Sequence, residues 1–245
     1  MKLTFLGTSH GAPEKNRHCT SVLIEYRGYH YLIDLGAPVD YLFKQMELSV
    51  DTLRGVFITH MHADHTAEFT ALVKSFSVYH RSAEADVFLP EEKAIDPLKS
   101  WICAQHIDYP DRLHTHVTHP GVIYDVDGLR VTAIRTEHIA PDVPSYAYIF
   151  EADGKRILFT GDLAYDYHDY PVEAKNESFD VVVSELVHLS IDKAQAILEG
   201  TNTRLMIFSH IGLENIAQME KQEISFAFPH IIACDGFSYY VPKAR

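Results

Sequence analysis

The sequence is poor in cysteine and has no long apolar run. Its three cysteines, Cys19, Cys103 and Cys234, are far apart and form no CxxC pair, which excludes a disulfide framework and indicates a reducing compartment. No stretch reaches the roughly 18 consecutive apolar residues of a membrane span. The apolar start of the chain meets Gly7 too early for the core of a signal peptide. We therefore expect a cytoplasmic protein without a membrane segment.

Basic residues are scarce as well. The 245 residues include 21 Lys and Arg against 34 Asp and Glu, which gives a formal net charge of −13. Binding to a polyanion depends on Lys and Arg that neutralise phosphates, so this balance disfavours a nucleic acid partner unless it is small or single-stranded. The 47% of apolar residues are enough for a sizeable core, so the chain is not intrinsically disordered.

Short β-branched and aromatic runs alternate with amphipathic stretches along the chain. An antiparallel hairpin is expected around Arg27-Gly28. Two mixed halves of this kind predict two sheets packed on each other, with helices outside. Strands are predicted at residues 3–8, 21–26, 30–36, 55–60, 87–89, 128–136, 145–152, 155–162, 179–185 and 204–210, and helices at 38–48, 66–79, from 90 onwards and at 190–199, followed by a last short helix and strand.

Histidine is abundant, with 16 residues, and it is the commonest metal ligand in proteins. The densest group follows the predicted strand 55–60 and consists of His60, His62, Asp64 and His65. Side chains two residues apart point the same way in an extended backbone and not along a helix face, so this group belongs to a loop at a strand end. The alternative is a solvated polar loop. Three imidazoles and a carboxylate within six residues favour a metal site.

Three further candidate ligands also follow predicted strands. His138, Asp162 and His210 each come at the end of an apolar run, where a rigid sheet holds the loops that carry function. If all seven side chains converge, they are too many for one zinc ion, which takes about four ligands. They suit two ions that share a carboxylate.

These motifs resemble the motif series of the metallo-β-lactamase superfamily. They read THMHADH at 59–65, TEH ending at His138, TGD ending at Asp162 and SH ending at His210. The opening FLGTSHGAPEKNRHCTS and the later YLIDLG are similar to the front of its ribonuclease Z and cyclic phosphodiesterase branch. The resemblance implies an α/β fold, a four-layer αβ/βα sandwich of two mixed sheets with outer helices, formed by residues 1–245 as a single domain.

The resemblance also implies a division of ligands between two ions. One ion is assigned His60, His62 and His138, the other Asp64, His65 and His210, with Asp162 as the bridge. A metal-bridging hydroxide is then the nucleophile, because a metal lowers the pKa of water from 15.7 to about 7. Zn²⁺ is favoured by the imidazoles, with Mn²⁺ and Fe²⁺ as alternatives. Besides its role as ligand, Asp64 is a candidate catalytic residue.

This sequence departs from the ribonuclease Z pattern in two features. Only 24 positions separate His138 from Asp162, which leaves no room for the RNA-gripping arm that the resemblance implies there. Ser184-Glu185 stand where that family has a His-Glu pair. We therefore predict a dinuclear hydrolase, a phosphodiesterase for a small phosphodiester or cyclic phosphate. The alternatives are a lactone or ester hydrolase of the same fold, ribonuclease Z-like RNA processing and a non-catalytic binding member. A homodimer is an open alternative to a monomer.

The remaining candidates concern proton transfer and the substrate. His188, four positions after Ser184, is a candidate proton donor to the leaving group, with a structural histidine as the alternative. His10 and Arg17 in the opening loop are candidate substrate contacts, and either can instead be an ordinary surface residue. The stretch HTHVTH, with His114, His116 and His119, is predicted to be an exposed strand rather than a third metal site.

Overall fold

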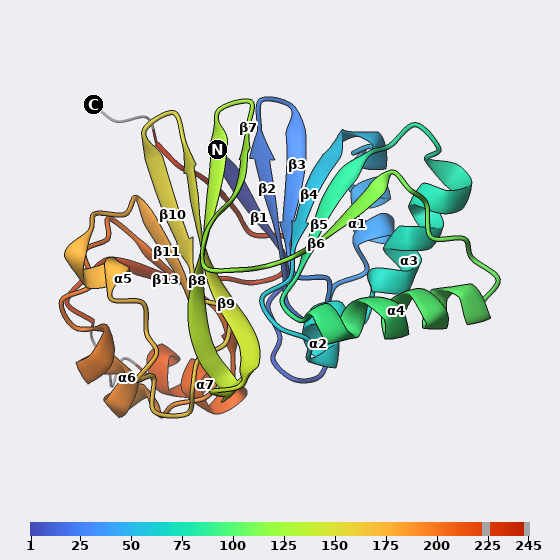
Figure 1. Cartoon of the computed structure of the whole chain (residues 1–245). Coiled ribbons are helices and arrows are strands. Elements are labelled where there is room, and N and C mark those ends of the chain that lie inside the picture. Colours follow the sequence, from blue (N-terminus) through green and yellow to red (C-terminus); the bar gives the residue numbers. More distant parts are fainter. Residues whose placement is uncertain (222–225, 243–245) are drawn as a thin grey trace.

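The computed structural model describes residues 1–221 and 226–242. Within them, two seven-stranded sheets face each other and carry helices on their outer sides (Figure 1). The predicted four-layer α/β sandwich is confirmed. No helix in the described residues is long and apolar enough to cross a membrane.

The first sheet has the order β14-β1-β2-β3-β4-β5-β6. Its pairs are antiparallel from β14 to β3 and parallel from β3 to β6. The strands are β1 Lys2–Gly7, β2 Ser21–Tyr26, β3 Tyr29–Ile33, β4 Leu53–Phe57, β5 Ala85–Leu89, β6 Leu113–Val117 and β14 Ser238–Tyr240.

The second sheet has the order β13-β12-β11-β10-β9-β8-β7. Its pairs are antiparallel from β7 to β10 and parallel from β10 to β13. The strands are β7 Gly121–Val126, β8 Leu129–Ala140, β9 Val143–Ala152, β10 Lys155–Phe159, β11 Val181–Leu186, β12 Met206–Ile211 and β13 His230–Ile232.

The helices divide between the two outer faces (Figure 1). Those beside the first sheet are α1 Val39–Gln45, α2 Ala63–Thr66, α3 Phe69–Lys74, which continues into a π-helical turn at Ser75–Tyr79, and α4 Glu92–Ala104. Those beside the second sheet are α5 Glu173–Asn176, α6 Ile191–Leu198 and α7 Leu213–Glu220.

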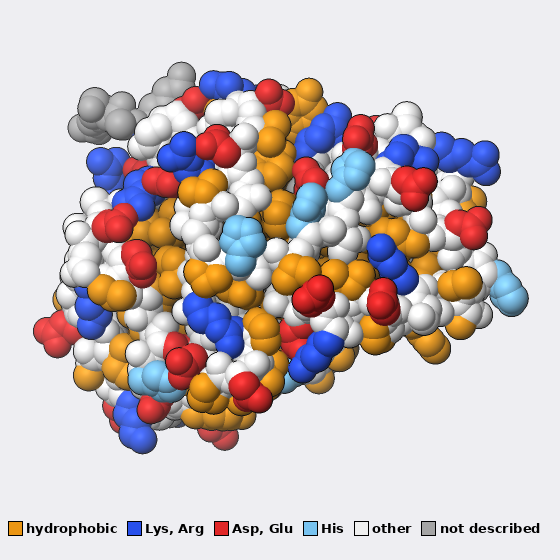
Figure 2. Space-filling view, viewed as in Figure 1, with side chains coloured by type: hydrophobic (Ala, Val, Ile, Leu, Met, Phe, Trp, Pro, Cys, Tyr) orange, Lys and Arg blue, Asp and Glu red, His pale blue; other side chains and the backbone are white. Residues whose placement is uncertain are grey.

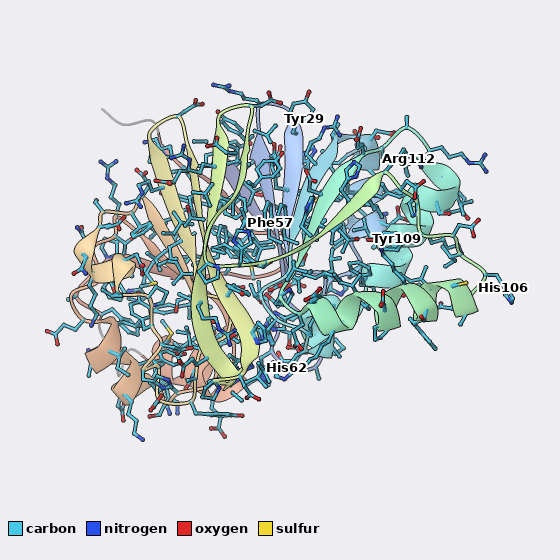
Figure 3. All side chains as sticks on the ribbon, viewed as in Figure 1. Tyr29, Phe57, His62, His106, Tyr109 and Arg112 are labelled. Carbon is cyan, nitrogen blue, oxygen red and sulfur yellow. The ribbon has the colours of Figure 1, made fainter. Side chains whose placement is uncertain are left out.

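The main core lies between the sheets and is rich in aromatic rings. Phe57 of β4 stacks on Phe88 with ring centroids 4.9 Å apart and meets Phe150 of the opposite sheet edge-on at 5.2 Å. Figure 3 labels Phe57 in this central position. The other faces of both sheets are buried under the helices in two further apolar clusters. Strands such as β11 and β12 are therefore buried on both faces, which explains their apolar runs Val181–Val183 and Met206–Phe208.

The structure differs from the predicted elements mainly in three places; in addition, the short helix α5 and the 3-10 turn at Val50–Thr52 were not predicted. The helix expected over 66–79 begins only at Phe69, as α3 and the π-helical turn that continues it, and the separate helical turn α2 precedes it. Strand β7 was not predicted, because it is an edge strand with mostly exposed side chains. The end of the chain forms two short strands rather than one, and each joins a different sheet: β13 pairs with β12 and β14 with β1.

Candidate metal centre

The HxHxDH loop begins where β4 leaves the first sheet. His62 has an extended backbone, with φ −62° and ψ 151°, and it is the residue before the first turn of α2. His60 thus belongs to the extended chain, whereas Asp64 and His65 belong to the helical turn. The chain passes from the end of β4 at Phe57 to the start of α2 at Ala63, and this change of backbone brings all four side chains into the candidate ligand groups. Figure 3 shows His62 there, between the β8–β9 hairpin and α2.

The buried carboxylate of Asp34 holds this loop in position. Asp34 accepts hydrogen bonds from the backbone N–H of Thr59 at 2.7 Å and from the Thr59 hydroxyl at 2.9 Å. It also accepts the Nδ1–H of His65 at 2.8 Å. That bond fixes the tautomer of His65, so its Nε2 is the free ligand atom, as in many metal sites. We did not single out Asp34 in the sequence, although it ends the YLID run.

His60, His62 and His138 form the first group of candidate ligands. Nε2 of His60 lies 2.9 Å from Nδ1 of His62, which lies 3.2 Å from Nε2 of His138. His138 comes from β8, and its Nδ1–H donates to the backbone oxygen of Leu163 at 3.0 Å. All three ligand atoms lie within 4.8 Å of one another.

Asp64, His65 and His210 form the second group, with the same mutual limit of 4.8 Å. Oδ2 of Asp64 lies 3.5 Å from Nε2 of His65 and 3.2 Å from Nε2 of His210. The backbone N–H of Gly11 in the opening loop donates to the same carboxylate oxygen at 2.9 Å. The front loop therefore reaches this second group.

Asp162 lies between the two groups. Its Oδ2 is 3.8 Å from Nε2 of His60 and 3.4 Å from Nε2 of His65, and its Oδ1 is 3.6 Å from Nδ1 of His210. The preceding Gly161 has φ +61°, and a Cβ there would come within 2.9 Å of a backbone oxygen. Glycine is thus needed at the turn that brings Asp162 into the site.

Burial and charge act in opposite directions on the groups of the site. Burial lowers the pKa of His60 and His62, which favours the neutral imidazole that binds metals. Burial raises the pKa of Asp162, but His210 and His65 outweigh it, and the pKa lies well below its usual range. Burial lowers the pKa of His65, but Asp162 and Asp34 raise it more.

The donor set fits divalent cations. Nε2 of His65 and Nδ1 of His210 are buried without a hydrogen-bond partner among the described residues. Unpaired buried polar atoms are rare in native proteins and need an explanation. Here both nitrogens face the ionised carboxylate of Asp162. A cation between them would bind the imidazole nitrogens and the carboxylate together. The seven side chains that the sequence singled out are thus brought together by the fold.

A family model described as "Anti-Pycsar protein Apyc1" matches residues 1–227. The chain belongs to this family.

The chain is also similar to individual relatives and solved structures. The ribonuclease Z of Methanocaldococcus jannaschii is 33% identical over 153 residues, which cover 62% of this chain and 47% of that protein. The chain thus spans about half the length of the curated relatives it matches. Human tRNase Z, short form, has a TM-score of 0.76 at 17% identity, and the match covers 99% of this chain and 100% of that protein. YhfI of Bacillus subtilis, a metallo-β-lactamase fold protein, has a TM-score of 0.75 at 19% identity, and the match covers 97% of this chain and 98% of YhfI.

The likeness to YhfI shows the metallo-β-lactamase fold that the sequence predicted, and the relatives named ribonuclease Z agree with the predicted branch. The likeness to the solved structures concerns the fold, because their sequence identity to this chain is low.

A Glu-His pair lies against the metal centre of this family member. The Nδ1–H of His188 donates to Oε1 of Glu185 at 2.7 Å, and Nε2 of His188 lies 4.0 Å from Oδ2 of Asp162. Glu185 also accepts the backbone N–H groups of Leu163, Val187 and His188. The sequence analysis named His188 but did not recognise that Glu185 would orient it. The spacing of three residues was the available signal.

The two candidate substrate contacts of the opening loop have different surroundings. His10 is half-buried, 3.4 Å from Glu14, and its ring centroid is 6.5 Å from that of His210. Arg17 donates to Glu14 at 2.7 Å and to the backbone oxygen of Ile211 at 3.1 Å, so it joins the loop to β12. Contact of either residue with a substrate stays a prediction.

The histidines of the HTHVTH stretch lie elsewhere. His114 pairs with Glu84 at 2.9 Å and His116 with Asp86 at 2.6 Å, on exposed positions of β6. In the part of the chain that the structure describes, neither joins a group of three candidate ligands. The prediction of an exposed strand is confirmed.

Proposed function

We propose that this protein is a dinuclear metal-dependent phosphodiesterase that hydrolyses a small phosphodiester or cyclic phosphate. The observation that carries the proposal is the convergence of two three-residue ligand groups on the single carboxylate of Asp162. Two buried imidazole nitrogens, on His65 and His210, have no hydrogen-bond partner among the described residues and support it.

The proposed ligands follow the two groups. His60, His62 and His138 would hold one ion and Asp64, His65 and His210 the other, with Asp162 as the carboxylate between the two groups. Zn²⁺ is the proposed metal because the set is rich in imidazole, and Mn²⁺ and Fe²⁺ are the alternatives. Two such ions supply an activated water and a Lewis acid for the phosphoryl oxygens when bound.

His188 is the proposed proton donor to the leaving oxygen. Burial lowers its pKa, but the hydrogen bond with Glu185 and the charge of that carboxylate raise it above the ordinary histidine value. A raised pKa increases the protonated fraction of His188 at a given pH, and a general acid must be protonated to act. Asp64, the other catalytic candidate, stays ionised and orients His210, to which it is hydrogen-bonded.

A small substrate is favoured over structured RNA. Between His138 and Asp162 the chain forms only the end of β8, the strand β9 and the strand β10, with the tight turn Asp153-Gly154. On the face shown in Figure 2, Lys and Arg side chains alternate with Asp and Glu and do not gather into a basic stripe. Binding to a nucleic acid backbone depends on such clusters. Ribonuclease Z-like processing is the second candidate, because the curated relatives carry that name.

Cytoplasmic location and a homodimeric state stay predictions, as does the single domain over residues 1–245. Gel filtration with light scattering measures the oligomeric state directly.

The first experiment measures metal content and activity on the same preparation. Elemental analysis should give roughly two divalent ions per chain. Hydrolysis of bis(p-nitrophenyl) phosphate should stop on chelation and in Asp162→Asn, which preserves shape but removes the charge. The matched control is His116→Ala, which removes an exposed imidazole outside the site.

The substrate panel separates the alternatives. Turnover of small phosphodiesters supports the proposal, and cleavage of precursor tRNA without them supports the ribonuclease Z-like candidate. Hydrolysis of lactones alone rejects the phosphodiester assignment. Full metal loading with no hydrolysis of any of these compounds would indicate a binding protein.

A further inference from the structure

A cleft of about 610 Å³ opens directly beside the metal centre. His10 of the opening loop and His188 after β11 both line it. Their ring centroids lie 6.5 Å and 6.0 Å from that of His210, so the inner end of the cleft is at the second ligand group. The outer part lies between the segment after β11 and the start of α7. A phosphodiester at the metal centre therefore has one ester group within reach of this cleft.

One side of the cleft is apolar. Val187, Leu189 and Leu213 line it, and the side chain of Leu213 is 60% exposed. Beyond His188 stands Tyr165, which is 74% exposed and meets the His188 ring edge-on with centroids 5.2 Å apart. Large exposed apolar side chains around a polar centre are typical of a ligand site rather than of ordinary surface. They fit a flat ring better than a charged group.

The polar side of the cleft is acidic. Glu14 and Glu214 line it together with the amide of Gln218, and none of the described residues that line it is Lys or Arg. The guanidinium of Arg17 is directed to Glu14 and to backbone oxygens. Arg17 thus compensates Glu14, whereas Glu214 has no ion pair among the described residues, so a second anionic group in the outer part of the cleft would face the carboxylate of Glu214. A group with N–H or O–H donors would instead find acceptors.

We propose that this cleft is a specificity site that binds one ester group of the phosphodiester. It selects an uncharged aromatic ring that carries hydrogen-bond donors, and it rejects a ring that carries a second negative charge. The inference rests on the proposed phosphodiesterase function and names its substrate class. Such a class excludes oligonucleotides and compounds with further phosphates in this position.

The test uses three p-nitrophenyl aryl phosphates that differ at one position of the second ring: phenyl, 4-aminophenyl and 4-carboxyphenyl. Release of p-nitrophenol by the metal-loaded protein gives kcat/KM, and calorimetric titration gives Kd without relying on turnover. We expect the 4-carboxyphenyl diester to be worse than the phenyl diester by roughly tenfold, and the 4-aminophenyl diester to be the best of the three.

Two variants connect the preference to the cleft. Glu214→Gln removes one carboxylate and should narrow the gap between the 4-aminophenyl and 4-carboxyphenyl diesters severalfold. Its matched control, Glu92→Gln, makes the same charge change on α4 and should leave the ratio as it is. Leu213→Ala should weaken all three diesters by roughly fivefold, because part of the apolar wall is lost, without altering the ratio.

The outcomes separate the two levels of the proposal. Equal kcat/KM and Kd values for the three diesters, or a ratio that is the same in Glu214→Gln, overturn the cleft assignment and leave the phosphodiesterase standing. If no diester is hydrolysed, the proposed function fails. The order of the Kd values then still decides whether the cleft selects its ligand as described.

Discussion

Replacement of Asp34 by asparagine tests how the second ligand group is oriented. Asp34 is buried and accepts hydrogen bonds from Thr59 and from the Nδ1–H of His65 at 2.8 Å. An amide of the same shape presents N–H groups to one of these donors, so the Nδ1–H bond of His65 is lost or its tautomer is reversed. A reversed tautomer turns a protonated Nε2 toward the ion. Loss of such an orienting carboxylate typically costs 10–100-fold in metal affinity.

The expected effect is specific to one ion. The Asp64–His65–His210 group depends on this tautomer, whereas His60, His62 and His138 do not contact Asp34 in the described hydrogen bonds. Titration with a chelator of known affinity should therefore show two metal-release steps in Asp34→Asn. Only the affinity of the ion at the Asp64–His65–His210 group should fall, by about 10–100-fold. The unpaired buried donor should also lower the free energy of unfolding by about 1–3 kcal/mol.

The control is another carboxylate-histidine pair of the same chain. Asp51 accepts from Nδ1 of His80 at 3.2 Å on the surface, remote from the ligand groups. Asp51→Asn should leave both release steps in place. An equal shift of both steps in Asp34→Asn, or none, would refute the claim that Asp34 acts through His65.

Three further predictions concern a glycine, a buried histidine and the proposed proton donor. Gly161→Ala places a Cβ at φ +61° within 2.9 Å of a backbone oxygen, so the free energy of unfolding from thermal denaturation should fall by about 1–3 kcal/mol. Gly154→Ala, where φ is +70° and the space is open, should lower it by only about 1 kcal/mol. Burial lowers the pKa of His30. The stability that its neutral form contributes is therefore complete above about pH 6.5 and is lost as the pH falls. His30→Gln should make the free energy of unfolding, measured by urea unfolding of the metal-free protein, less dependent on pH on the acid side. Glu185→Gln removes the carboxylate that raises the pKa of His188, so kcat for a small diester should fall by roughly 10–100-fold and its basic limb should move to lower pH; an unchanged limb excludes His188 as the acid.

The ligands could be predicted from the sequence because their chemistry is local. Imidazoles and carboxylates that directly follow apolar strands mark strand ends, and the ends of neighbouring parallel strands meet. His60, Asp162 and His210 follow this rule. The positions that act through another residue gave no comparable signal. Asp34 and Glu185 are single acids at strand ends, and their roles depend on which imidazole the fold brings to them.

Edge strands and helix breaks were the less predictable part of the fold. Strand β7 pairs on one side only, and most of its side chains are exposed, so it lacks the apolar alternation that marks a half-buried strand. The break between α2 and α3 arises because α2 serves the metal site. Its first turn carries Asp64 and His65, and the Nδ1–H of His65 donates a hydrogen bond to Asp34. Tertiary contacts, rather than helix propensity, decide this local geometry.

Backbone strain at the strand ends links the fold to metal binding. Asp34 and His210 both have φ in the left-handed region, at 61° and 51°, which costs non-glycine residues about 1–2 kcal/mol. Asp34 is compensated by its bonds to Thr59 and His65. His210 has the hydrogen bond between its Nε2 and Asp64, but its Nδ1 is buried without a hydrogen-bond partner among the described residues, so a bound cation would supply the remaining compensation. Chelation should therefore increase hydrogen exchange more at residues 209–212 than at 34–36, and equal protection at both segments after metal removal would contradict this account.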